Sequence, residues 1–135
     1  MPRPGVCCVI GAGDATGSAV ARRFAKEGYT VCVARRTATA LKPLVDQITV
    51  EGGKAVAFGL DARREDQVVN FFHQIEAEVG PVEVLVSNAG ITADAFMIRM
   101  TEERFEKVID TNLTGAFRVA QRAARSMQRN RFGRM

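Results

Sequence analysis

A glycine-rich turn near the N-terminus has the residue types and spacing with the clearest chemical use. Gly11, Gly13 and Gly17 follow an apolar run at residues 6–10 and precede a helix-like run at residues 18–27. The N-terminus of a helix offers unpaired N–H groups and a partial positive charge, both of which suit a diphosphate. Glycine is needed where the backbone turns sharply or passes close to a phosphate. A merely structural turn is the alternative, but its place between a strand and a helix predicts a dinucleotide site.

The end of the second predicted strand indicates which dinucleotide is preferred. An NAD-preferring site places Asp or Glu there to bond the ribose hydroxyls, whereas this chain has Ala34, Arg35 and Arg36. Two guanidinium groups suit the charge and the acceptor geometry of a 2′-phosphate. The sequence therefore predicts NADP(H) as the cofactor in preference to NAD(H). The alternative is that one or both arginines simply face solvent.

Strands and helices alternate along the 135 residues. Four apolar runs, at residues 6–10, 29–34, 55–60 and 82–86, predict buried strands, and glycines end the helical patterns between them. Strands separated by helices of this length pair in parallel through right-handed crossovers. The pattern predicts one α/β domain over residues 1–135, an open parallel sheet with helices on both faces.

The last predicted helix is long and basic. It begins after Thr101, a plausible N-cap, and runs to about Asn130. Its second half is expected to place Phe117, Ala120, Ala124 and Met127 on one side and arginines on the other. The arginines near the C-terminus are Arg118, Arg122, Arg125, Arg129, Arg131 and Arg134. They indicate either a solvated helix face or a patch for nucleic acid, anionic lipid or an acidic protein. No aromatic residue lies between Arg118 and Arg131 to stack bases, which argues against nucleic acid.

The remaining composition is ordinary for a globular domain. No stretch approaches the roughly 20 apolar residues of a membrane span, and the run at residues 6–10 is too short for a signal peptide. We therefore expect a cytoplasmic protein. Cys7, Cys8 and Cys32 lie in apolar runs without Cys-x-x-Cys or Cys/His spacing, which predicts buried thiols and no metal site. His73 is expected on a helix surface.

The order of these motifs resembles that of the short-chain dehydrogenase/reductase family. The family's Gly-x-x-x-Gly-x-Gly pattern maps onto Gly11, Ala15 and Gly17, and Asp61-Ala62 is similar to its adenine-contacting Asp and the next residue. Ser87-Asn88-Ala89-Gly90 is similar to the Asn-Asn-Ala-Gly motif, and Asn112 to the helix asparagine of the catalytic tetrad. The resemblance implies a Rossmann-like sheet of order 3-2-1-4. The predicted cofactor site comprises Gly11, Gly13, Asp14, Ala15, Thr16, Gly17, Arg35, Arg36, Asp61, Ala62, Asn88, Ala89 and Gly90, with Asn112 as an accessory catalytic residue.

Two departures from the family pattern affect the expected affinity. Ala15 puts a methyl group where the backbone should pass close to phosphate. Asp14 adds a negative charge where NADP enzymes of the family often carry a basic residue. Both are expected to weaken phosphate binding without abolishing it.

The family's catalytic Ser and Tyr-x-x-x-Lys do not occur in this sequence. The only tyrosine is Tyr29, and Val33 lies four positions on. Arg134-Met135 corresponds to the start of the family's next strand, so we expect a chain truncated before those groups and inactive alone. Loss of a positioned acid removes a factor of about 10²–10⁴ in rate. An open fourth-strand edge and an apolar helix face would favour homo-oligomers.

The segment from Val82 to Met135 is especially similar to bacterial 3-oxoacyl-(acyl-carrier-protein) reductases of fatty acid biosynthesis. The resemblance implies reduction of a 3-oxoacyl thioester by NADPH, with Arg129 and Arg131 as candidate contacts for the acyl-carrier protein. The alternative is a non-catalytic nucleotide-binding or protein-interaction module. Oxidation of NADPH in the presence of an acetoacetyl thioester would exclude that alternative.

Overall fold

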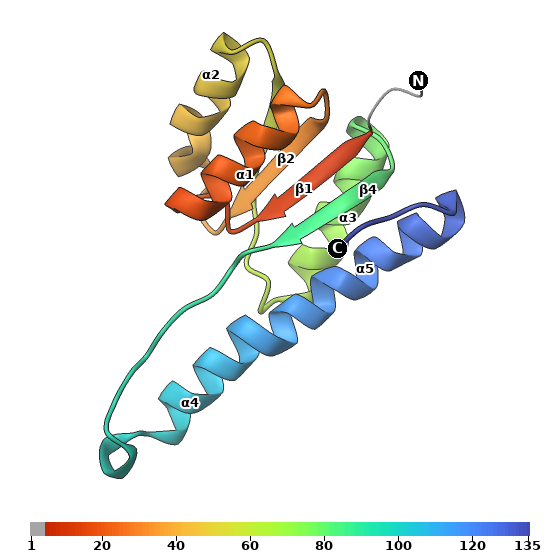
Figure 1. Ribbon diagram of the computed structural model, residues 1–135. Coiled ribbons are helices and arrows are strands. Elements are labelled where there is room, and N and C mark those ends of the chain that lie inside the picture. Colours follow the sequence, from red (N-terminus) through yellow and green to blue (C-terminus); the bar gives the residue numbers. More distant parts are fainter. Residues whose placement is uncertain (1–4) are drawn as a thin grey trace.

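Four short segments form the sheet in the computed structural model, which describes residues 5–135 (Figure 1). The strands are β1 (Val6–Ile10), β2 (Thr30–Arg35), β3 (Lys54–Gly59) and β4 (Val82–Ser87). All neighbours pair in parallel, in the order β3-β2-β1-β4. The fold class and strand order are therefore as predicted, and the first four residues of the predicted domain lie outside the described residues.

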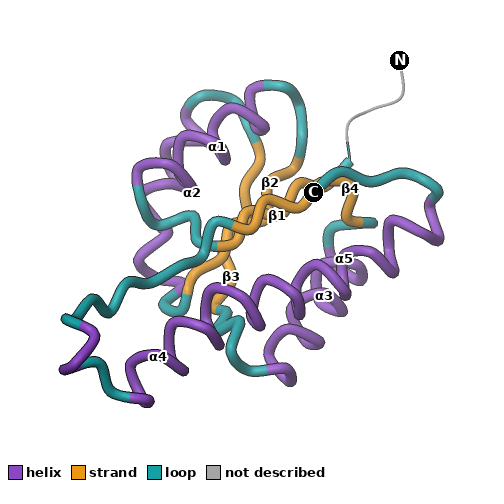
Figure 2. Tube along the Cα trace, turned by 60° about the horizontal axis from the view of Figure 1, so that its bottom comes forward, coloured by secondary structure: helices purple, strands orange, loops and turns teal. Residues whose placement is uncertain are grey.

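Helices cover both faces of this sheet (Figure 2). On one face lie α1 (Ala15–Lys26) and α2 (Lys42–Val50), the latter preceded by a 3₁₀ turn at Ala38–Leu41. On the other lie α3 (Glu65–Glu78) and α5 (Gly115–Asn130). Within residues 5–135 no helix combines the length and apolar character needed to cross a membrane.

The central strand β1 separates two hydrophobic cores because its side chains alternate between the faces. Cys7 and Val9 pack with α1 and α2, whereas Cys8 and Ile10 pack with α3 and α5. Every residue of β1 is buried, which explains its unbroken apolar sequence. The three cysteines are free and buried, as predicted, and burial raises the pKa of the Cys7 thiol to about 12.

The predicted long helix runs without a break from Glu102 to Asn130, but it contains a π turn. Helix α4 (Glu102–Ile109) begins after Thr101, whose side chain accepts a hydrogen bond from the Arg104 N–H, as expected of an N-cap. A π turn at Asp110–Thr114 then joins α4 to α5. Helix α4 and the turn before it project away from the sheet (Figure 1).

The predicted inner face of α5 is partly wrong. Met127 is buried, but Phe117 is 61% exposed and Ala124 is exposed, and Val119 and Ala123 take their place in the core. Gly115 lets the start of α5 lie close to the segment after β3, since a Cβ at this position would be 3.3 Å from the Cβ of Ala62. The aromatic ring of Phe117 is therefore turned outward.

The outer edge of β4 is partly covered. The Leu85 N–H donates to the Arg134 carbonyl at 2.9 Å, and the Arg134 N–H donates to the Glu83 carbonyl at 3.0 Å. Arg134 thus forms a parallel bridge with Val84, at the position where the sequence predicts a further strand to begin.

We predict that Gly17→Ala destabilises the protein by about 1–3 kcal/mol although alanine favours helices. A Cβ at this position would collide with the Gly11 carbonyl and lie 2.8 Å from the Cα of Ala12. Urea unfolding followed by circular dichroism measures the effect. The control is Gly59→Ala, whose Cβ would have its nearest neighbour at 3.5 Å; equal stabilities for the two variants would contradict this account.

Candidate functional site

The four strands end at one edge of the sheet, where a cleft of about 500 Å³ opens. The chain leaves neighbouring strands β1 and β4 toward helices on opposite faces, and such a switch point is where open α/β sheets bind ligands. Predicted site residues from every strand end line this cleft: Gly11, Gly13, Asp14, Arg35, Arg36, Asp61, Ala62, Asn88, Ala89 and Gly90. Ala15, Thr16 and Gly17 form the adjoining first turn of α1, and Asn112 is not part of the lining.

The glycine turn brings the start of α1 against the ends of two strands. Gly11 has a φ of +78°, and a Cβ there would lie 2.5 Å from the backbone nitrogen of Ala89. Helix α1 begins at Ala15, earlier than the predicted residue 18. The N–H groups of Ala15 and Thr16 have no acceptor in the described chain, so the first turn has free donors beside the cleft.

Asp14 caps α1 and connects it to β4. Its carboxylate accepts a hydrogen bond from the Gly17 N–H at 2.6 Å, and the Asn88 amide nitrogen donates to both carboxylate oxygens at 3.0 and 3.1 Å. The same amide nitrogen donates to the Gly11 carbonyl at 3.0 Å. Asn88 therefore ties the turn after β1 to the end of β4. Asp14 also places a negative charge at the mouth of the cleft.

The end of β2 is electropositive. Arg35 and Arg36 are exposed and line the cleft, and neither takes part in an ion pair within residues 5–135. The Arg35 guanidinium lies against Gly13, where it would meet an added Cβ. The two arginines are thus exposed to solvent and also face the cleft.

Asp61, at the end of β3, is held by a neighbour that the sequence analysis did not single out. The Arg63 Nε donates to Asp61 Oδ1 at 3.0 Å, and the Arg63 Nη2 donates to Oδ2 at 2.8 Å. The Arg63 backbone N–H adds a bond of 3.1 Å to Oδ1, while the Asp61 N–H donates to the Gln67 side chain at 2.8 Å. Above all because of the hydrogen bonds from the Arg63 side chain, the pKa of the Asp61 carboxyl lies below its ordinary value.

Asn112 lies in the π turn and holds the loop after β4. Its Oδ1 accepts from the Ile91 N–H at 2.9 Å, and its Nδ2 donates to the Ile91 carbonyl at 2.9 Å. The loop passes Gly90, Ile91 and Thr92 along the cleft. Asn112 therefore shapes the cleft from outside its lining, which is a frequent use of π turns at functional sites.

Further residues of the lining were not identified from the sequence: Thr37, Arg63, Thr92, Lys107 and Thr111. Arg63 and Thr37 lie just after strand ends, and that position was the available signal. Lys107 and Thr111 reach the cleft through the course of α4, which no local pattern fixes.

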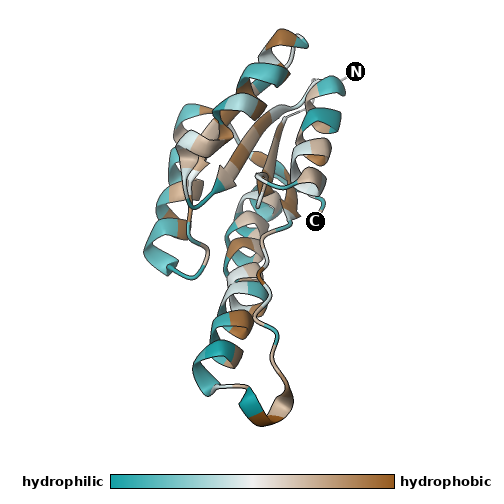
Figure 3. Ribbon diagram, turned by 90° about the vertical axis from the view of Figure 1, so that its left-hand side faces the viewer, coloured by the Kyte–Doolittle hydropathy of each residue, from teal (hydrophilic) through white to brown (hydrophobic). Residues whose placement is uncertain are grey.

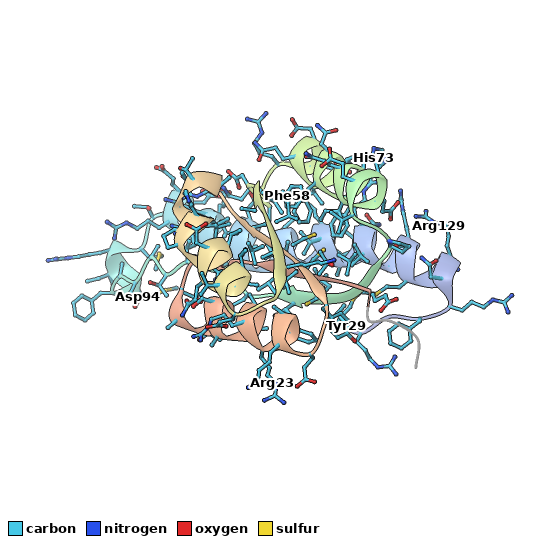
Figure 4. The ribbon with its side chains drawn as sticks, turned by 90° about the horizontal axis from the view of Figure 1, so that it is seen from above. Arg23, Tyr29, Phe58, His73, Asp94 and Arg129 are labelled. Carbon is cyan, nitrogen blue, oxygen red and sulfur yellow. The ribbon has the colours of Figure 1, made fainter. Side chains whose placement is uncertain are left out.

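The C-terminal arginines do not form one free basic face. Arg118 Nη1 donates to the Arg63 carbonyl at 2.8 Å and to Asp110 at 3.2 Å. Arg129 pairs with Glu76 of α3 at 2.9 Å, and Figure 4 shows it on α5, with His73 on the exposed surface of α3. Arg131 is exposed and ends α5 with a φ of +53°.

No group of three or more His, Cys, Asp or Glu within residues 5–135 is arranged to hold a metal ion.

The chain matches known proteins over nearly its whole length. The family model for short chain dehydrogenases matches residues 5–135. The chain is 53% identical over 129 residues to the 3-oxoacyl-(acyl-carrier-protein) reductase MabA of Mycobacterium tuberculosis, covering 94% of this chain and 47% of that reductase. It thus spans about half the length of the curated relatives it matches.

Solved structures of the same family superpose on this chain over nearly its whole length. A short-chain type dehydrogenase/reductase from Mycobacterium marinum superposes with a TM-score of 0.91 at 37% identity, over 93% of this chain and 50% of that one. Actinorhodin polyketide ketoreductase with NADPH gives a TM-score of 0.92 at 30% identity, over 96% of this chain and 51% of that one.

We predict that Asp61→Asn lowers the melting temperature at pH 7 and that the difference from the wild type shrinks in acid. Because the folded-state pKa of Asp61 is lowered, its stabilising contribution is present above the unfolded value of about 3.9. The contribution is lost as the pH falls through the lower, folded-state value. Thermal unfolding of both proteins from pH 7 down to about pH 2 measures this.

The control is Asp46→Asn, because Asp46 is 58% exposed and pairs only with Lys42 on the same helix, and exposed pairs of this spacing contribute about 0.3–0.5 kcal/mol. Its melting temperature should stay close to that of the wild type at neutral pH. A constant gap between Asp61→Asn and the wild type across the whole pH range would show that the charge of Asp61 contributes nothing.

Proposed function

The chain belongs to the short-chain dehydrogenase family, and we propose that it is the NADP(H)-binding portion of a 3-oxoacyl-(acyl-carrier-protein) reductase. The observation that carries the proposal is the cleft at the switch point, which adjoins the free amides of α1 and is lined by the two arginines at the end of β2. In the complete reaction a 3-oxoacyl thioester would be reduced to its 3-hydroxy form. Bound NADPH would supply the hydride.

The cleft residues fit the parts of the cofactor in a definite order. The amides of Ala15 and Thr16, with the dipole of α1, would bind the diphosphate. Asn88, Ala89 and Gly90 would lie along the nicotinamide half, and Asp61 and Ala62 at the adenosine end. Gly11, Gly13 and Gly17 would keep side chains out of the diphosphate region. Asp14 and the methyl group of Ala15 would weaken binding, because one repels phosphate and the other crowds it.

Arg35 and Arg36 would select NADP(H) over NAD(H). They lie after β2, where a carboxylate would otherwise bond the ribose hydroxyls. A 2′-phosphate at this position gains charge-assisted hydrogen bonds, each worth about 1.5–3 kcal/mol. Neither guanidinium forms an ion pair with a carboxylate in the described chain, so no ion pair has to be broken when the phosphate binds.

Self-association would cover an apolar stripe on the projecting helix. Phe105, Ile109, Leu113 and Phe117 are spaced by four residues through α4, the π turn and α5, and they are 58%, 39%, 65% and 61% exposed. Figure 3 shows hydrophobic residues, in brown, along α4 and in the turn before it. Such a stripe together with the outer edge of β4 supports a homo-oligomer.

Arg129 and Arg131 are the residues that we propose as contacts for the acyl-carrier protein. Of the two, Arg131 is the one without an ion pair in the described chain.

We predict that calorimetric titration gives tighter binding of NADPH than of NADH. The double variant Arg35→Gln/Arg36→Gln should lower the affinity for NADPH by about 10–100-fold and leave that for NADH nearly unchanged. Arg23→Gln is the matched control, since Arg23 pairs with Glu27 on the outer side of α1 (Figure 4) and is not part of the cleft. Tighter binding of NADH by the wild type would overturn the assignment.

We also predict no turnover by the 135-residue chain alone. Tyr29 packs edge-on against Phe24 at the amino end of β2, at the opposite end of the strand from the cleft, so it is no substitute for the family's proton donor. NADPH absorbance in the presence of acetoacetyl thioester should decline no faster than in a protein-free blank. A rate within about tenfold of a complete reductase would refute this, since a positioned acid is worth about 10²–10⁴.

A further inference from the structure

Arg63 is held in the cleft more firmly than any other cationic side chain there. Its guanidinium makes two parallel bonds to the Asp61 carboxylate, at 3.0 and 2.8 Å, and only 31% of the side chain is exposed. Arg35, Arg36 and Lys107 line the same cleft without an ion pair in the described chain. A bidentate pair fixes the plane of a guanidinium as well as its position.

The backbone of Arg63 is fixed too. Arg118 on α5 donates to the Arg63 carbonyl at 2.8 Å, and the preceding Ala62 packs against Gly115 with little free space. Asp61 is further anchored by its bond to Gln67 of α3. The segment after β3 is thus attached to both helices of that face, so the Arg63 side chain is positioned before any ligand arrives.

The place of Arg63 results from the topology. A dinucleotide with its diphosphate at the start of α1 would extend one nucleoside across the ends of β2 and β3, because the sheet order places those strands beside β1. Arg63 lines this part of the cleft with Leu60 and Thr37.

Arg63 is paired with Asp61 at hydrogen-bond distance, whereas Arg35 and Arg36 make no ion pair in the described chain, although the charge of Arg36 also acts on Asp61. A guanidinium whose plane is fixed by a bidentate carboxylate is suited to stack on the face of a nucleobase, since guanidinium groups stack on aromatic rings. We propose that Arg63 is the stacking platform for the adenine ring and that Asp61 is a positioning residue that acts through it. The inference rests on the proposed function, because it requires a dinucleotide in the cleft.

The test is calorimetric titration of Arg63→Gln and Arg63→Lys with NADPH and with NADH. Both variants should weaken both ligands by a similar factor of about 3–30, because the adenine is common to the two and lysine keeps the charge but not the plane. Arg64→Gln is the matched control: Arg64 is the next residue, it pairs with Asp66, and it does not line the cleft. Melting temperatures show that each variant is folded.

Several results would overturn the inference. A loss confined to NADPH, or a full rescue by lysine, would mean a phosphate contact, and unchanged affinities would mean no contact. The double variant Asp61→Asn/Arg63→Gln should bind no more weakly than Arg63→Gln alone; additive losses would show that Asp61 contacts adenine independently. Wild-type protein that binds neither dinucleotide would overturn the proposed function itself, and the inference with it.

Discussion

The first turn of α1 approaches the ends of β1 and β4 so closely because positions 11 and 17 carry no side chain. A Cβ on Gly11 would meet the backbone of Ala89, and one on Gly17 would meet the Gly11 carbonyl. This contact brings the free amides of α1 beside the cleft, and the Asn88 side chain connects the ends of the two strands. A longer side chain at either glycine would separate the helix dipole from the strand ends, so the site depends on this approach before any charged residue contributes.

The charged side chains of the cleft differ in whether they are already paired or hydrogen-bonded within the chain. Arg35 and Arg36 lack ion pairs in the described chain, so their guanidinium groups are available to an anion, although the charge of Arg36 also acts on Asp61. Arg63 is neutralised by Asp61, and Asp14 is bound by Gly17 and Asn88. Asp14 is favourable for the empty protein, because an N-cap carboxylate stabilises the helix by about 1 kcal/mol, yet it repels the anion that the same helix would bind. Stability and affinity are therefore opposed at this residue.

The parts of the fold that local sequence controls were predictable. Buried parallel strands give unbroken apolar runs, so β1 was placed to the residue, and the glycines after α1, α2 and α3 marked the ends of these helices. Features set by distant contacts, such as the π turn and the outward Phe117, were not. The pairing of Arg63 with Asp61 is a local contact two residues apart, and its place just after β3 was the one signal for it. Most of the cleft was found because strand ends of a parallel sheet meet at one edge, whereas Lys107 and Thr111 arrive from a helix whose path no short pattern fixes.

The π turn links two surfaces with different requirements. On its inner side Asn112 fixes the Ile91 backbone and Asp110 pairs with Arg118, so the turn supports the loops on both sides of the cleft. On its outer side Leu113 lies in the exposed apolar stripe between Ile109 and Phe117. A π turn is a single turn with i→i+5 hydrogen bonds inside an α-helix, and such turns are frequent at functional sites. A partner that covers the stripe would therefore restrain the same turn that holds Ile91, and burial of the stripe would stiffen the cleft without contacting the nucleotide.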